Sequence, residues 1–290
     1  VFYQNERSAL EEARLQKFDR VLSNVDPPNQ YMLGQVGNVD GYNSGVLSGY
    51  EQFLRGVSGA ARTTSPRILL DGSIPDPRAL AFLGARYAIS SEPIENEMFE
   101  RVTPGASSDL YEIPGTLPRA FVVYDAVLAE TPQDALAVLR DGDFDYGSQV
   151  VLEEPIQIGP APNGEAVVDI VRYSEADGGM FLQVESDEPG ILVLSEPYFS
   201  ERGAWLDGRE TEMLRVNLGF IGVPVPAGSH DVELRYVPTS LHTGGAVTAF
   251  SLLVVIVALV YTIGRGSRHG EDTSSASAES ASLQGRIRQG

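Results

Sequence analysis

A stretch of 21 residues without a charged side chain, GGAVTAFSLLVVIVALVYTIG at positions 244–264, constrains the fold of this chain more than any other feature. At a rise of 1.5 Å per residue, a helix of this length spans the roughly 30 Å of hydrocarbon in a bilayer. The alternative is a helix buried in a water-soluble core. Such a helix normally has polar residues on one face, and residues 252–260 have none. The sequence therefore predicts one transmembrane helix at 244–264.

Basic residues follow this stretch closely and are scarce before it. Arg265 and Arg268 come directly after it, whereas the nearest upstream arginine is Arg235. Because cytoplasmic flanks carry the excess of Lys and Arg, we expect a cytoplasmic tail at 265–290 and an extracytoplasmic location for residues 1–243. The tail is rich in Ser, Ala and Gly, which predicts disorder.

The amino-terminal end carries no recognisable export signal. It reads VFYQNERSALEEARLQKF, which is charged and lacks an apolar h-region. Since residues 1–243 would need a signal peptide or membrane helix to leave the cytoplasm, we expect one or more membrane segments upstream of Val1. A cell-wall sorting signal is excluded, because LHTGG at 241–245 lacks the proline of the LPxTG motif and the tail is too long.

Composition excludes several classes of function. The chain has 21 basic and 40 acidic residues and a net charge of −19, so it lacks the clustered Lys and Arg that nucleic-acid binding requires. It has no cysteine, which excludes disulfides, thiol catalysis and Cys-ligated zinc. No cofactor or metal site is expected.

Residues 1–155 alternate between helical and strand patterns, which indicates a small mixed α/β subdomain outside the membrane. Thr131 and Pro132 are suited to the N-cap and first position of a helix in TPQDALAVLRD. The other expected elements are helices at 6–22, 50–57 and from about Pro77, and strands at 86–90 and 120–127.

Residues 156–240 change to short strands. Met180, Leu182 and Val184 alternate with polar residues, and so do Val232, Leu234 and Tyr236, as in sheets with one wet face. Turn signals separate the strands, at 177–179, 189–190, 207–208 and 227–228. This pattern predicts an antiparallel β-sandwich of about seven strands, so the expected fold is α+β: a mixed α/β layer, a β-sandwich and one C-terminal transmembrane helix.

Five segments together resemble the YfhO-like bacterial membrane proteins, a polytopic family related to glycosyltransferases that use lipid-linked sugars. In order, they are LAFLGARYAIS at 80–90, LPRAFVV at 117–123, DGDFDYGSQVVLEE at 141–154, GILVLSEPYFSERGAWLDG at 190–208 and VPVPAGSHDVELRYVP at 223–238. The family usually has Tyr-Tyr-Pro-Gly-Trp before the Asp-Gly turn, whereas this chain has YFSER at 198–202 and its tryptophan at Trp205.

The resemblance implies an enzyme with many membrane helices that transfers sugars onto cell-envelope polymers outside the membrane. Its catalytic carboxylates belong to loops between early membrane helices, which this chain lacks. The partners implied are the lipid bilayer, upstream membrane helices of the same protein, and an envelope glycopolymer or lipid-linked sugar. The resemblance names no catalytic residue here.

Two motifs suggest chemistry but do not meet its requirements. The alternating carboxylates of DGDFDYG at 141–147 suggest a calcium loop, but an EF-hand loop needs Gly and Glu where this chain has Tyr146 and Leu152. A solvated turn is the simpler interpretation. A Ser-His-Asp hydrolase has little support, because there is no G-x-S-x-G and His230 lies in a predicted strand.

Exposed aromatic residues near polar ones are candidates for stacking on a sugar ring, although such residues more often belong to a sandwich core. The candidate carbohydrate contacts are Tyr198, Phe199, Trp205, Asp207 and Arg209.

Three hypotheses remain open. The first is the non-catalytic extracytoplasmic end of a membrane glycosyltransferase, and the second is a single-span surface protein that binds carbohydrate. The third is a structural module that keeps the last helix in register with its neighbours.

Overall fold

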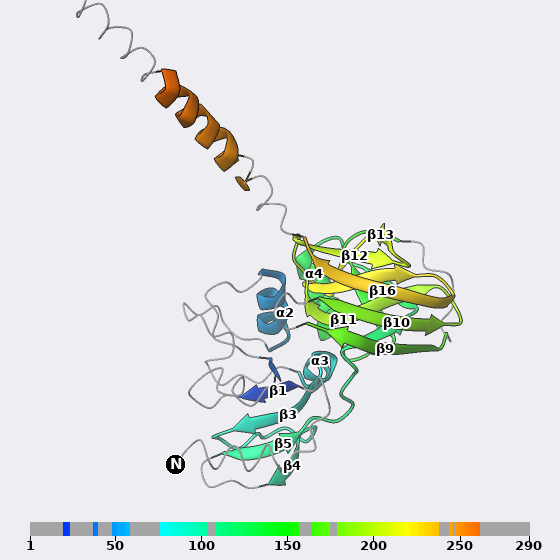
Figure 1. Ribbon diagram of the computed structural model, residues 1–290. Helices are drawn as coiled ribbons and strands as arrows, with labels where there is room; N and C mark the ends of the chain where they lie inside the picture. The colour runs from blue at the N-terminus through cyan, green and yellow to red at the C-terminus, as the bar shows by residue number, and fades with distance from the viewer. Residues whose placement is uncertain are drawn as a thin grey trace, which may run out of the picture. The chain divides into compact units, whose positions relative to one another are not determined.

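The computed structural model describes residues 20–23, 37–39, 48–58, 76–103, 108–156, 164–174, 179–237, 244–245 and 247–261. The chain divides into two units, Val1–Val237 and Pro238–Gly290. The described part of the first unit is rich in β-structure and contains three short helices (Figure 1). This confirms an α+β fold in which strands dominate.

The first sheet is mixed and has five strands. Its order is β2 (Gly37–Asn38), β1 (Arg20–Ser23), β3 (Ala85–Ser90), β5 (Asp109–Glu112) and β4 (Glu100–Thr103). β1 pairs in parallel with β2 and β3, whereas β5 is antiparallel to both of its neighbours. The prediction of a helix through 6–22 is wrong for residues 20–22, which lie in β1; the rest of that range lies outside the described residues.

The second sheet has six strands in the order β6 (Ala120–Val123), β11 (Gly190–Pro197), β15 (Phe220–Val225), β14 (Leu214–Val216), β8 (Gln149–Leu152) and β7 (Asp125–Leu128). β6 and β7 are at opposite edges of this order, yet only Tyr124 separates them in the sequence. The sheet must therefore curl until its two edges meet at Tyr124. The strand expected at 120–127 changes partner there, from β11 to β8.

The third sheet is entirely antiparallel. Its order is β13 (Arg209–Thr211), β12 (Arg202–Leu206), β16 (Gly228–Tyr236), β10 (Met180–Ser186) and β9 (Ala166–Tyr173). We call the end where β16 finishes, at Tyr236, the exit end, because the chain leaves the sheet there. We call the opposite end, where β16 begins, the hollow end, because a surface hollow lies near it.

Two apolar cores lie on the two faces of the second sheet. Ile191 and Val193 of β11 belong to the larger core, while Leu192 and Leu194 belong to the smaller one. The smaller core also contains the inward residues of the third sheet, among them Leu182 of β10 and Val232 and Leu234 of β16. A strand covered on both faces reads as a continuous apolar run, and one with a wet face alternates. GILVLSEP of β11 and MFLQVES of β10 show these two patterns.

Three helices pack with the larger core. They are α2 (Ser48–Ser58), α3 (Pro77–Phe82) and α4 (Pro132–Arg140). Thr131 caps α4 by accepting a hydrogen bond from the backbone N–H of Asp134, at 3.2 Å, with Pro132 at the first position. These three helices confirm the expected positions at 50–57, from Pro77 and from Pro132.

The expected boundary at residue 155 does not divide the strands into separate layers. β6, β7 and β8 precede this residue, yet they share the second sheet with β11, β14 and β15, which follow it. Residues on both sides of the boundary also contribute to each core.

Residues 247–261 form a helix in the second unit, drawn in orange in Figure 1. Across the described residues, no helix combines the length and the apolar character needed to cross a membrane. The tail expected at 265–290 lies outside the described residues.

Candidate functional site

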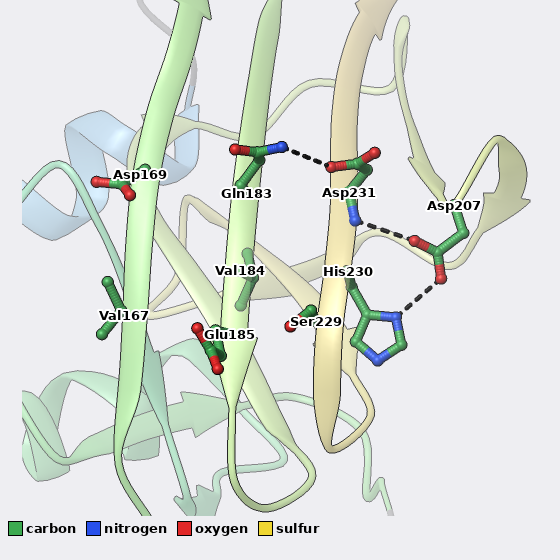
Figure 2. Close-up of a pocket in the computed structure, with 9 residues that line it drawn as sticks. All are labelled: Val167, Asp169, Gln183, Val184, Glu185, Asp207, Ser229, His230 and Asp231. Carbon is green, nitrogen blue, oxygen red and sulfur yellow. Dashed lines mark hydrogen bonds and ion pairs between the residues drawn. The ribbon is translucent and has the colours of Figure 1, made fainter.

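The outer face of the third sheet has a hollow of ≈ 350 Å³ near its hollow end (Figure 2). Asp169 of β9, Gln183 of β10 and Asp231 of β16 lie side by side across three strands, because they are register partners. Figure 2 shows Asp207 reaching toward them from the turn between β12 and β13. The hollow is lined by Val167, Asp169, Gln183, Val184, Glu185, Asp207, Ser229, His230 and Asp231.

A tight turn brings Asp207 to this position. Asp207 and Gly208 have φ angles of 51° and 77°, and they form the two-residue loop of a hairpin, for which Asp-Gly is a preferred sequence. The carboxylate of Asp207 accepts a hydrogen bond from the backbone N–H of Asp231, at 2.9 Å. It also lies 2.8 Å from Nδ1 of His230. The turn predicted at 207–208 is confirmed.

The contacts of His230 indicate which form of its imidazole the site favours. Nδ1 faces the carboxylate of Asp207, and Nε2 faces the carbonyl oxygen of Ala227 at 3.3 Å. Both partners are acceptors, and only the protonated imidazolium can donate from both nitrogens. Accordingly, the hydrogen bond to Asp207 raises the pKa of His230, although partial burial opposes the shift. The same bond, together with the N–H of Asp231, lowers the pKa of Asp207.

This arrangement suits polar binding better than proton abstraction. A general base must present a lone pair to its substrate, whereas both ring nitrogens of His230 face acceptors of the protein itself. Four carboxylates can instead accept hydrogen bonds from a hydroxyl-rich ligand, and the Gln183 amide can both accept and donate them. Among the described residues, no three His, Asp or Glu side chains are placed to hold a metal ion.

The structure does not gather the five candidate carbohydrate contacts into one site. Only Asp207 lines the hollow. Tyr198 packs against the smaller core, and Arg209 is exposed at the start of β13. Phe199 lies at the exit end, where its ring centroid is 6.2 Å from that of Tyr236.

Trp205 is half-buried and packs against its neighbours. A Cβ atom added to Gly203 would lie 2.8 Å from Cη2 of Trp205, so the indole lies over this glycine. The Arg235 guanidinium carbon is 4.7 Å from the indole centroid. The indole is therefore engaged in packing and in a cation–π contact.

Sequence reasoning did not select the other residues of the hollow as a site. Gln183, Glu185 and Asp231 were recognisable as outward positions of alternating strands, but the pairing of β9, β10 and β16 is needed to bring them together. His230 was dismissed as a strand residue. Its approach to Asp207 depends on the β12–β13 turn.

A buried ionic cluster lies at the exit end, where Arg202 begins β12. The Glu196 carboxylate accepts from Arg20 at 2.7 Å and from Nε of Arg119 at 2.6 Å, and Nη1 of Arg202 lies 4.0 Å from it. Burial raises the pKa of Glu196, but the three arginines more than offset this effect and the net pKa is lowered. Arg20 belongs to β1 and Glu196 to β11, so the cluster links the first and second sheets.

The segment considered as a calcium loop, residues 141–147, is held by hydrogen bonds from Arg78 and from residues within or next to the segment. Arg78 donates to the carbonyl oxygens of Asp141 and Gly142 at 2.9 and 2.8 Å. The Asp145 carboxylate accepts from the N–H of Gly147 and the hydroxyl of Ser148. These bonds hold a turn between α4 and β8.

Comparison with known proteins identifies one related family. Residues 167–248 match the model of the family described as bacterial membrane protein YfhO. No curated protein and no solved structure matches the chain. The matched range runs from β9 to β16 and into the helix at 247–261, and it supports a membrane location. Over residues 167–248, therefore, this chain is YfhO-like, which confirms the resemblance of its segments at 190–208 and 223–238.

Proposed function

We propose that this chain is the extracytoplasmic C-terminal region of a membrane glycosyltransferase that modifies cell-envelope polymers, and that it has no catalytic activity by itself. The observation that carries the proposal is the YfhO match, which covers β9 to β16 and reaches the first residues of an apolar helix. The second and third sheets would form the expected β-sandwich outside the membrane. Upstream membrane helices of the same protein would supply the catalytic carboxylates.

The proposal places residues 244–264 in the bilayer, with residues 1–243 outside the cytoplasm. Large apolar side chains of the described helix are exposed, from Ile256 at 50% to Phe250 at 68%. Exposed apolar residues on every side of a helix are unfavourable in water and favourable in lipid. The arginines after residue 264 favour a cytoplasmic tail.

Cysteine labelling can test this topology without background, because the chain has no cysteine. We would introduce Glu210→Cys in β13, Ser251→Cys in the helix and Ser275→Cys in the tail, one at a time, into the full-length protein. On intact cells, a membrane-impermeant maleimide should label only the first variant. Permeabilisation should add the third but not the second. Labelling of Ser275→Cys but not Glu210→Cys on intact cells would refute the orientation.

The enzymatic part of the proposal needs a separate test in the source cells. Deleting the full-length protein should remove a sugar substituent from an envelope polymer, as measured by sugar analysis of the purified polymer. An unchanged sugar composition would refute the assignment to glycosyl transfer while leaving the topology intact.

A second candidate function is carbohydrate binding by a single-span surface protein, and the hollow is the observation that favours it. Its carboxylates could accept hydrogen bonds from sugar hydroxyls, and the Gln183 amide could both accept and donate them. The full chain in detergent should then bind members of a panel of neutral and amino sugars. Gln183→Ala or Asp231→Asn should weaken binding, while Arg209→Gln, at an exposed arginine outside the hollow, should not. Absence of binding across the panel would favour the structural-module hypothesis.

A further inference from the structure

The exit end of the third sheet carries aromatic side chains where the chain leaves the sheet. Tyr236, the last residue of β16, is 48% exposed, and its ring lies beside that of Phe199. The N–H of Val237 donates to the carbonyl oxygen of Glu201 at 2.6 Å, which fixes the end of β16 to the loop that carries Phe199. These two rings are therefore held at the point of exit.

The covalent connection limits how far this end can lie from the apolar segment. Six residues separate Val237 from Gly244 in the sequence. Seven consecutive Cα–Cα steps of a fully extended chain span at most about 25 Å. If residues 244–264 are in a bilayer, the exit end cannot lie far from its surface. The nine residues of β16 place the hollow end about 27 Å further along the strand.

Charge is also distributed unevenly along the outer face of β9, β10 and β16. Toward the exit end, the exposed arginines Arg172 and Arg235 lie over the rings of Phe181, at 6.0 Å, and Trp205, at 4.7 Å. Both arginines pair with Glu233. Toward the hollow end, the charged residues on this face of the three strands are Asp169, Glu185 and Asp231.

Arginine and aromatic side chains together suit the headgroup region of a bilayer. Tyrosine and other amphipathic rings are enriched at membrane interfaces, and guanidinium groups bind phosphate oxygens. A carboxylate-rich surface is instead repelled by anionic lipids. The chemistry of the exit end thus matches a lipid surface, and that of the hollow end does not.

We propose that Phe199 and Tyr236 contact the headgroup region of the bilayer, so that the hollow faces away from the membrane. Arg235, next to Tyr236 in β16 but on the opposite face of the strand, would contribute its charge at the same end of the sheet. This inference rests on the proposed membrane insertion of residues 244–264. It assigns Phe199, a candidate sugar contact by sequence, to a lipid contact.

Tryptophan fluorescence can test the contact, because the chain has a single tryptophan. In a Trp205→Phe background, tryptophan is introduced at one position: Tyr236→Trp, Phe199→Trp, Val167→Trp at the hollow end, or Phe250→Trp in the helix. Each full chain is reconstituted into phosphatidylcholine nanodiscs whose acyl chains are brominated near the glycerol. Tryptophan at 236, 199 or 250 should fluoresce less in brominated than in unbrominated nanodiscs. Tryptophan at 167 should fluoresce equally in both.

The four positions separate the failure of this inference from that of the proposed membrane insertion. Quenching at 250 but at neither 199 nor 236 would overturn the lipid contact and leave the membrane helix standing. Absence of quenching at 250 would reject both. Equal quenching at 167 and 236 would also overturn the proposed orientation. Tyr236 is exposed, so its variant remains informative if Phe199→Trp impairs folding.

A matched pair of arginine variants tests the charge argument. Arg235→Gln and Arg209→Gln remove the same charge from exposed positions toward opposite ends of the third sheet. In nanodiscs that also contain phosphatidylglycerol, Arg235→Gln should reduce the quenching of Tyr236→Trp, and Arg209→Gln should leave it unchanged. Equal effects of the two substitutions would contradict a local role for Arg235.

Discussion

The two ends of the third sheet are built from the same strands but differ in chemistry. The exit end combines aromatic rings, exposed arginines and, beneath them, the buried Glu196 cluster. The hollow end presents carboxylates and the His230–Asp207 pair around an open hollow. The comparison suggests that the exit end is fixed by buried charge and packing, whereas the hollow end is held by solvent-accessible hydrogen bonds. Substitutions should therefore be far more costly at the exit end.

The largest effect is expected from Glu196→Gln at the exit end. The substitution keeps the shape of the side chain but leaves Arg20, Arg119 and Arg202 without their shared buried counter-charge. Removing one partner of a buried ionic group costs about 3–5 kcal/mol. Urea unfolding of the full chain in detergent should show this loss, and Glu185→Gln at the hollow end should cost much less. Similar losses for both variants would remove the contrast between the two ends.

The stabilising effect of Glu196 should also depend on pH in a defined direction. Its folded-state pKa is lowered, so its contribution is present above the unfolded pKa and lost as pH falls through the folded pKa. Wild-type stability should thus decline toward acidic pH more steeply than that of Glu196→Gln.

An intermediate effect is expected from Gly203→Ala, also toward the exit end. The added methyl group would lie 2.8 Å from Cη2 of Trp205, so the indole must move from its position beside Arg235. Overpacking of this kind costs about 1–3 kcal/mol. The emission of the single tryptophan should shift to longer wavelength as the ring becomes more exposed. Gly142→Ala, where an added Cβ meets nothing within 4 Å, is the control. An unshifted emission spectrum for Gly203→Ala would show that the position of the indole does not depend on a glycine at 203.

The smallest effect is expected at the hollow end, from Asp207→Asn. The Asp207 carboxylate raises the pKa of His230 above its ordinary value of 6.5, and the amide cannot replace the charge. NMR titration should show the pKa of His230 returning toward 6.5 in the variant, with His230→Gln used to assign the signal. A His230 pKa that stays raised would show that Asp207 is not its cause.

The same pair predicts a small dependence of stability on pH. Because the folded-state pKa of His230 is raised, its contribution is fully present below the unfolded pKa and lost as pH rises through the folded pKa. Wild-type stability should therefore fall slightly above neutral pH, and Asp207→Asn should not show this fall. Solvent exposure of the pair keeps the effect small.

Local sequence signals predicted the elements that depend on local interactions. Thr131 and Pro132 marked the start of α4, and Asp207-Gly208 marked a hairpin turn, because capping and turn chemistry act within a few residues. The alternation in β10 identified its wet face. In β16, Val232 and Leu234 are buried as expected, but Tyr236 is exposed because it lies beyond the core at the end of the strand.

Elements that depend on distant partners were not predictable in the same way. Residues 20–22 have helical spacing of apolar residues, yet β1 forms because Arg20 pairs with Ala85 of β3 and Val21 with Tyr87. The candidate site was found only in part for the same reason. Asp207 was selected from its neighbours in sequence, whereas Asp169, Gln183 and Asp231 meet only through strand pairing.

The sequence by itself determined the uncharged segment at 244–264, the acidic balance, the alternating strands and the turns, because each is a property of consecutive residues. Only the tertiary structure decided that β6 and β7 close the second sheet at Tyr124 and that two cores lie on its faces. It also decided that the charges of the third sheet separate toward two ends. These features depend on which strands pair and in which register, and pairing joins residues that no local pattern connects.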